Sequence, residues 1–240
     1  MTSDLYNYDY FHRADGIRSW NSKTLKFGDA MAALCYAFGI SWQDLQQGFP
    51  EVFAEDDRTG RVERHSDKLT QQLDFIKQNK SRTPKRVLEI GGGRGEVAQA
   101  LRYLGVDVVS IEPGAGADKW YQETAEKFFG SEFDATLPDN RYLQDAVADL
   151  DFSTFDTILM VESLEHILEE QFDPVWQQIV DKFHGLFVVV NWVNYHPIAV
   201  GQFASAAEHC RLVDDVLYEK WISQSKQCVW RNGSHLVLDF

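Results

Sequence analysis

The sequence predicts an α/β fold built on a mainly parallel sheet, and three observations carry this prediction. From Lys85 onward, short apolar runs alternate with amphipathic helical patterns, as in right-handed βαβ units. One apolar run ends in a glycine-rich turn that leads directly into a helical pattern. Close to the C-terminus, Asn232-Gly233 separates two strand-like segments, which indicates an antiparallel hairpin at the end of the sheet.

The first part of the chain differs in character from the rest. We expect a helical N-terminal extension or cap over residues 1–83 and an α/β domain over residues 84–240. No strand pattern precedes Pro84, and apolar residues recur at helical spacing in three stretches: Lys26–Phe38, Trp42–Phe49 and His65–Asn79. Aromatic residues near the N-terminus are expected to pack this extension onto the sheet, to close over a ligand cleft, or both: Tyr8, Tyr10, Phe11 and Trp20.

After Lys85 the elements can be placed in order. Strands are expected at Val87–Ile90, Val106–Ile111, Thr157–Val161 and Leu186–Asn191, with a weaker one near Asn140–Leu143. Helical patterns lie between or after them, at Glu96–Leu104, Ala117–Phe129, Leu164–Lys182 and Ile198–His209. The C-terminal segments have a β-like pattern: Leu212–Tyr218, Gln227–Trp230 and His235–Phe240.

The turn after the first of these strands is the most informative motif. It reads Glu89-x-Gly91-x-Gly93-x-Gly95, and the helical pattern begins at Glu96. Glycines at a strand-to-helix turn let a ligand lie against bare backbone, beside the unpaired N–H groups of the helix start. A dinucleotide fingerprint that starts at Gly91 would need a sixth-position glycine where Glu96 stands, which disfavours a nicotinamide dehydrogenase.

A matching acidic residue follows the second strand. Glu112 lies 21 residues after Gly91, where a carboxylate can accept hydrogen bonds from both hydroxyls of a ribose. Further along, the run Leu143-Gln-Asp-Ala-Val-Ala-Asp-Leu precedes Phe155-Asp156 and the fourth strand. Because ligands in open α/β sheets bind at the carboxyl ends of the strands, these motifs are expected to meet at one edge.

Together these motifs resemble those of the class I S-adenosylmethionine-dependent methyltransferases, over roughly residues 84–200. The resemblance implies a Rossmann-like, seven-stranded sheet with an antiparallel C-terminal strand. It also implies S-adenosyl-L-methionine as cofactor and S-adenosyl-L-homocysteine as product. It places Glu112 on the ribose, Asp145 on the adenine amine and the Ala146 N–H on a ring nitrogen, and it gives Asp156 a structural role. The implied cofactor-binding set is Glu89, Gly91, Gly92, Gly93, Gly95, Glu112, Asp145, Ala146, Glu162 and Ser163, the last two on the methionine side.

Two histidines are candidate general bases. His166 follows the fourth strand and His196 follows the fifth, and histidine is the usual base near neutral pH. For His166 a structural or cofactor-side role stays open, and for His196 simple solvation does. Trp192 and Tyr195 would extend an aromatic-lined pocket, which suits an apolar or ring-containing acceptor. No residue pattern supports a metal site.

Composition restricts the partners. The 240 residues carry a formal net charge of −14, which disfavours nucleic acid as substrate and favours a small molecule. No apolar run reaches the roughly 20 residues of a membrane helix, and no secretory signal is visible. Cys35, Cys210 and Cys228 have no metal-ligand spacing, so we expect reduced thiols and a cytoplasmic protein.

The expected function is therefore methyl transfer to an oxygen or nitrogen atom of a small-molecule acceptor. The alternative is a catalytically inactive protein that binds S-adenosylmethionine or S-adenosylhomocysteine as a regulatory or scaffolding subunit. The identity of the acceptor and the oligomeric state are left open by the sequence.

Overall fold

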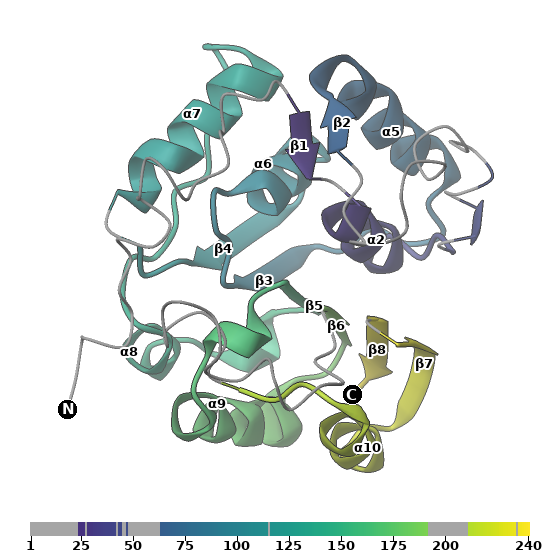
Figure 1. Ribbon diagram of the computed structural model, residues 1–240, viewed down its shortest axis with the longest axis vertical. Coiled ribbons are helices and arrows are strands. Elements are labelled where there is room, and N and C mark those ends of the chain that lie inside the picture. The colour runs from purple at the N-terminus through teal and green to yellow at the C-terminus, as the bar shows by residue number, and fades with distance from the viewer. Residues whose placement is uncertain are drawn as a thin grey trace.

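The protein has three layers, with a twisted sheet between two sets of helices (Figure 1). The computed structural model describes residues 24–26, 28–41, 43–44, 47, 63–114, 116–191, 211–233 and 235–240. The main sheet has the strand order β4-β3-β5-β6-β8-β7. Its strands are β3 (Arg86–Ile90), β4 (Asp107–Ile111), β5 (Thr157–Val161), β6 (Leu186–Val190), β7 (Gln227–Asn232) and β8 (His235–Asp239).

Strand directions agree with the prediction. β3, β4, β5 and β6 pair in parallel, whereas β8 is antiparallel to both β6 and β7. The order reverses at β3, whose neighbours are β4 on one side and β5 on the other. Such a reversal point leaves a crevice at the carboxyl ends of the strands, where open α/β sheets bind their ligands.

Within the described residues the sheet has six strands, whereas seven were expected. The weak strand placed near Asn140–Leu143 is reduced to one parallel bridge, between Ile111 and Asp139. Pro138 lacks an N–H to donate to a ladder, and α8 already begins at Leu143. The edge of β4 is therefore covered by a short irregular segment.

The two faces of the sheet carry different helices. One is covered by α2 (Gly28–Ala37), α5 (Ser66–Asn79), α6 (Glu96–Tyr103) and α7 (Ala117–Phe129), and the other by α8 (Leu143–Ala148), α9 (Glu169–Lys182) and α10 (Asp215–Gln224) (Figure 1). Successive strand residues alternate between the two cores, as a pleated strand requires. Leu159 and Val188 belong to the first core, and Ile158 and Phe187 belong to the second. Both faces are therefore buried, as parallel sheets require.

The N-terminal extension contains strands that were not expected. β1 (Thr24–Lys26) pairs antiparallel with β2 (Glu63–His65), so the expectation of no strand before Pro84 is wrong. Three-residue strands are too short to leave a periodic pattern in the sequence. Two of the three predicted helices are present as α2 and α5, and α2 packs against β5 and β6. The third, at Trp42–Phe49, lies mostly outside the described residues.

Three further expectations need correction. The β-like stretch Leu212–Tyr218 instead leads into α10, whose first turn is capped by Asp214 accepting from the Leu217 N–H at 2.9 Å. The single helix expected over Leu164–Lys182 is split into a 3-10 turn, η3 (Leu164–His166), and α9. The hairpin is present, but its loop lies one residue later, because Asn232 still pairs with His235. The helix expected at Ile198–His209 lies outside the described residues.

Candidate functional site

The glycine turn connects β3 to α6 at the carboxyl edge of the sheet. Gly91, Gly93 and Gly95 have φ angles of +76°, +57° and +82°, a region that side chains disfavour and glycine adopts freely. The Gly91 N–H donates to the Ile111 carbonyl at 2.9 Å, and the Gly95 N–H donates to the Gly92 carbonyl at 2.8 Å. These bonds hold the turn against β4 and close it on itself.

Tyr121 of α7 forms the floor of the turn. A Cβ added to Gly95 would lie 2.6 Å from its ring, and one added to Gly92 would collide with its hydroxyl. The fully buried Tyr121 hydroxyl bonds Ser110 Oγ at 2.7 Å, and Ser110 Oγ donates to the Glu89 carboxylate at 2.6 Å. Because Ser110 gives its only proton to Glu89, the Tyr121 hydroxyl is the donor to Ser110.

Gly93 differs from its neighbours. No heavy atom of the described residues lies within 4 Å of a Cβ built on it, so this face of the turn opens into free space. The absence of side chains at Gly92 and Gly95 is explained by Tyr121, but packing does not explain Gly93. Its left-handed φ of +57° accounts for the glycine, and the open face leaves room for a ligand against the turn. The turn can therefore cradle a group at Gly93 that any side chain there would displace.

Glu112 follows β4 and lies beside the turn. Its side chain accepts from the Gly93 N–H at 2.7 Å and from the Gly114 N–H at 3.2 Å. The residue is only 5% exposed, and burial raises the pKa of its carboxyl to about 7 against the pull of both backbone donors. Each carboxylate oxygen accepts one of these two bonds and keeps a lone pair, so hydroxyl groups of a ligand can still donate to it.

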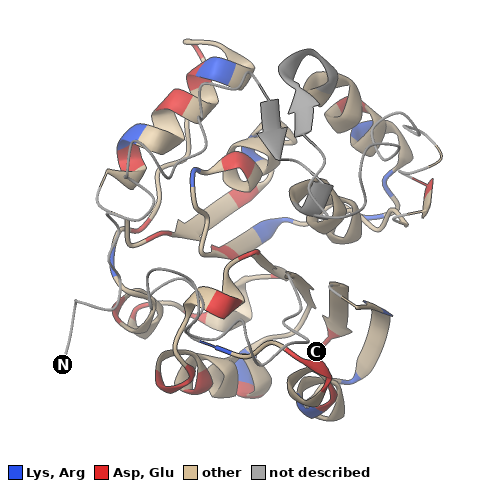
Figure 2. Ribbon diagram, in the orientation of Figure 1, with Lys and Arg blue, Asp and Glu red and all other residues tan. Residues whose placement is uncertain are grey.

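Glu89 is the second buried carboxyl of the site. It is 2% exposed, and burial raises its pKa to about 7 although Ser110 donates to it. Two carboxyls that lose solvation at one edge of the sheet favour a cationic ligand, because a nearby positive charge stabilises their ionised forms. Figure 2 shows mainly acidic charged residues on α9 and a mixture of acidic and basic residues on α7. The two buried carboxyls of the site do not favour an anionic polymer.

Asp145 and Ala146 lie in the first turn of α8, beyond the edge of β4. Asp145 is exposed and Ala146 is buried. The bridge at Asp139 joins this segment to the sheet, because the Asp139 N–H donates to the Ser110 carbonyl at 2.7 Å and its carbonyl accepts from the Glu112 N–H at 3.0 Å. The Ala146 N–H donates to the Tyr142 carbonyl at 2.9 Å, within the helix. The structure thus connects the Asp145 segment directly to Glu112.

The carboxyl end of β5 completes the edge. Glu162 is the only non-glycine residue with positive φ in the described part of the chain, at +48°, and its N–H donates to the Val190 carbonyl at 2.8 Å. Ser163 is 6% exposed, and its hydroxyl donates to the Ile90 carbonyl at 2.9 Å. Its Cβ also fills the space where a Cβ on Gly91 would stand. In this structure Ser163 ties β5 to β3.

Asn191 is another residue that sequence analysis did not single out. It is fully buried after β6, and its side-chain oxygen accepts from the Leu164 N–H at 3.1 Å, which fixes the start of η3. Neither Asn191 nor the pair Ser110 and Tyr121 belongs to a recognisable motif. Their roles depend on contacts between residues far apart in the chain, so no local pattern could have found them.

The two candidate bases are not placed equally. His166 lies in η3 with its side chain 24% exposed, and its Nε2 is 3.8 Å from a side-chain oxygen of the buried Glu165. His196, like Trp192 and Tyr195, lies outside the described residues. No group of three potential metal ligands occurs among the residues that the structure describes. Within the same part of the chain, no helix is long and apolar enough to span a membrane.

Comparison with known proteins points to one kind of domain. Residues 61–174 match the model of a methyltransferase domain family. A ubiquinone biosynthesis O-methyltransferase of Hahella chejuensis is 27% identical over 96 residues, which cover 40% of this chain and 38% of that protein's length. A magnesium protoporphyrin IX methyltransferase from Synechocystis PCC 6803, solved with bound S-adenosylhomocysteine, has a TM-score of 0.50 at 13% identity, covering 96% of this chain and 95% of the other. That last likeness concerns the fold.

Proposed function

We propose that this chain, which carries a class I S-adenosylmethionine-dependent methyltransferase domain, transfers a methyl group from S-adenosylmethionine to an oxygen or nitrogen atom of a small-molecule acceptor in the cytoplasm. The observation that carries the proposal is the meeting of three motifs at one edge of the sheet. The open face at Gly93, the Glu112 carboxylate and the Asp145 segment are adjacent there and are joined by hydrogen bonds.

The residues at this edge fit the cofactor. Glu112 would accept from the ribose hydroxyls, and the exposed Asp145 carboxylate would accept from the adenine amine. The ligand would lie against the glycine turn at Gly93, and Glu89 would lie near the amino-acid part of the ligand. Glu162 would line the methionine side, and Ser163 would hold the turn there through Ile90. For Ala146 to reach an adenine nitrogen, its N–H bond to Tyr142 has to open.

The cofactor supplies an electrophilic methyl group on a sulfonium, so the residues of the chain mainly align the acceptor and exclude water. An oxygen or nitrogen acceptor also has to lose a proton. We assign this step to His166 or His196, with Nε2 of His166 already beside the Glu165 carboxylate that would stabilise the imidazolium. Alanine variants distinguish the two histidines. Only the variant that lacks the general base should lose turnover while it keeps its affinity for the cofactor.

The proposal is tested first by calorimetry. S-adenosylmethionine and S-adenosylhomocysteine should bind in a 1:1 ratio, and NAD should not compete with them. Turnover is then followed as formation of S-adenosylhomocysteine with a panel of small molecules. The panel starts with ubiquinone-biosynthesis intermediates, because one relative bears that name. Failure of both cofactors to bind would refute the proposal, whereas binding without product over a broad panel would favour a non-catalytic binding protein.

A further inference from the structure

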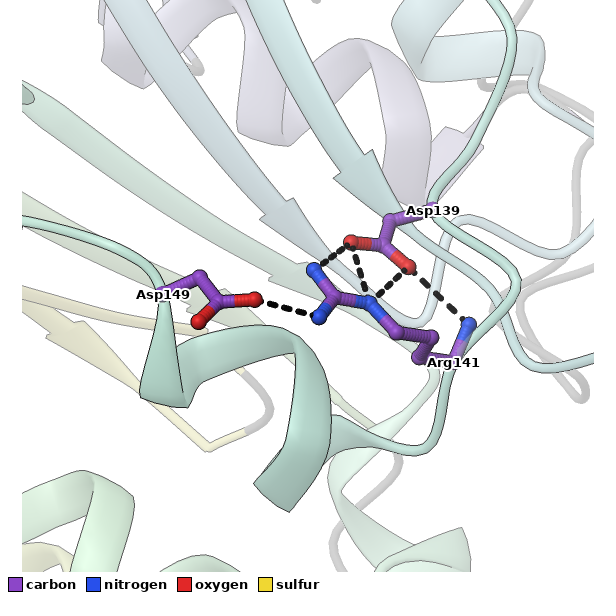
Figure 3. Close-up of polar contacts among 3 residues, drawn as sticks. All are labelled: Asp139, Arg141 and Asp149. Carbon is purple, nitrogen blue, oxygen red and sulfur yellow. Dashed lines mark hydrogen bonds and ion pairs between the residues drawn. The ribbon is translucent and has the colours of Figure 1, made fainter.

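One arginine, Arg141, bonds the first and the last residue of the segment from Asp139 to Asp149. Arg141 Nε lies 3.0 and 3.2 Å from the two carboxylate oxygens of Asp139, and its Nη2 lies 2.7 Å from Oδ2. Nη1 of Arg141 donates to Oδ2 of Asp149 at 2.5 Å, and the backbone N–H of Arg141 donates to Oδ1 of Asp139 at 3.0 Å (Figure 3). Asp139 is the residue that bridges to β4, and Asp149 is the C-cap of α8. The guanidinium thus joins the two ends of the segment.

Between these two ends lie the residues assigned to the adenine side. Asp145 is in the first turn of α8, and one flank of this helix is anchored by the buried side chains of Leu143, Ala146 and Val147. The other flank is exposed. Its contacts include the ion pair of Arg141 with Asp149 and a bond from the Gln144 amide to the Glu170 carbonyl of α9 at 3.2 Å. Of these two, only the Arg141 ion pair ties the flank to Asp139 and so to the edge of β4.

The same network reaches the ribose side. The carbonyl of Asp139 accepts from the N–H of Glu112, and the Glu112 side chain bonds Gly93 of the glycine turn. In the seven-stranded arrangement a complete strand would hold this edge through a ladder of backbone bonds. Here a single bridge does so, and the bidentate geometry of Arg141 on Asp139 replaces part of the missing ladder.

We infer that Arg141 is a positioning residue for the nucleoside half of the cofactor site: through Asp139 and Asp149 it holds the Asp145 turn in register with Glu112. This inference rests on the proposed function. Arg141, Asp139 and Asp149 have side chains 46%, 26% and 69% exposed, so their ion pairs add little to global stability. Their effect is local and should appear in ligand affinity.

The test compares Arg141→Gln and Arg141→Lys with wild type, with S-adenosylhomocysteine and 5′-methylthioadenosine as the titrated ligands. Both ligands contain the nucleoside, but only the first contains the amino-acid part. We expect Arg141→Gln to weaken both by the same factor, about three- to tenfold, as the ion pairs stop favouring one loop conformation. Arg141→Lys keeps the charge but not the bidentate geometry and should recover only part of the loss.

Arg231→Gln is the matched control. Arg231 also joins two carboxylates, those of Asp215 and Glu219, but it does so between β7 and α10 at the far edge of the sheet. The Arg231→Gln variant should keep the wild-type affinity for both ligands. If Arg141→Gln does not fold, Asp149→Asn removes one exposed arm alone and should show a smaller loss of the same kind.

The outcomes distinguish a failure of the role of Arg141 from a failure of the proposed function. Affinities within twofold of wild type in the folded Arg141 variants, or an equal loss in Arg231→Gln, would overturn the role of Arg141 while the cofactor site stands. A loss confined to S-adenosylhomocysteine would also overturn it, because the effect would then lie on the amino-acid side. A wild-type protein that binds neither ligand would refute the proposed function itself.

Discussion

At the scale of single residues, Gly93 connects backbone geometry to ligand binding most directly. Its neighbours Gly92 and Gly95 are required by Tyr121, whereas Gly93 faces open space with a φ of +57°. A side chain there would meet no atom of the described residues and would occupy the position of the ligand. Among these residues, the cost to the fold is the strain of a left-handed non-glycine residue.

We therefore predict that Gly93→Val abolishes binding of S-adenosylhomocysteine and leaves the protein folded. Gly105→Val is the matched control. Gly105 has a φ of +82° and no described atom near a Cβ built on it, and it lies just before β4, at the amino ends of the strands and away from the glycine turn. Both variants should lose about 1–2 kcal/mol of stability from the strained backbone, and only Gly93→Val should lose binding. Calorimetry and thermal unfolding check this, and unchanged affinity in Gly93→Val would refute the assignment of the turn.

Glu162 is the residue at which local preference and structure disagree. A glutamate at φ +48° carries strain that a glycine would not, and such outliers concentrate at functional sites. We predict that Glu162→Gly raises the free energy of unfolding by about 0.5–1 kcal/mol, after the greater entropy of glycine in the unfolded chain is subtracted. Turnover should fall in the same variant. Denaturant unfolding measures the first effect, and a destabilised variant would show that the strain is compensated by contacts of the side chain.

At the scale of elements, α7 matters because it carries the floor of the glycine turn. Tyr121→Phe removes only the hydroxyl that donates to Ser110 and keeps the ring beneath Gly95. We predict a loss of about 1 kcal/mol in stability, the usual value of one buried hydrogen bond, with binding nearly intact. Tyr121→Leu would remove the ring and should weaken the cofactor as well. Equal binding in both variants would mean that α7 does not support the turn.

The helices and strands of the α/β part were predictable wherever a long periodic pattern existed. α7 has the predicted bounds of Ala117–Phe129, and β3 and β5 lie within one residue of theirs. The strands β1 and β2 were missed because three polar-rich residues have no period. The segment before α10 was misassigned because the apolar residues Leu212, Val213 and Val216 are typical of a strand. The helix begins there because the Asp214 side chain caps it through one bond to the Leu217 N–H.

The candidate site was predictable where its residues belong to motifs. The structure places the glycine turn, Glu112 and the Asp145 segment at adjacent strand ends, whereas the roles proposed for them still have to be measured. Ser110, Asn191 and Arg141 could not have been found, because each acts through a partner distant in the chain or through a geometry set by the fold. The contribution of His196 and the N-terminal aromatic residues stays a prediction.

At the scale of the whole molecule, buried acidic groups couple folding to pH. The pKa values of Glu89 and Glu112 are raised to about 7 in the folded state, above the ordinary 4.5. The folded protein therefore holds more protons than the unfolded chain between these values, so stability falls as pH rises through this window. A cationic ligand at the site favours the ionised carboxylates and opposes the effect.

We predict two consequences of this coupling. Without ligand, the free energy of unfolding should decrease from pH 5 to pH 8, and Glu112→Gln should flatten part of that decrease. With ligand, affinity for S-adenosylmethionine should rise over the same range more than affinity for S-adenosylhomocysteine, which lacks the sulfonium charge. Denaturant unfolding and calorimetry at constant ionic strength check both. A pH profile that Glu112→Gln leaves unaltered would show that other groups set it.

A crystal structure with S-adenosylhomocysteine would show whether the carboxyl ends of β4, β3 and β5 form an S-adenosylmethionine site. We expect the ligand to lie across the glycine turn at Gly93, with its ribose hydroxyls on the Glu112 carboxylate and its adenine beside Asp145. A ligand bound elsewhere on the molecule, or one at these strand ends with its ribose away from Glu112, would refute the site.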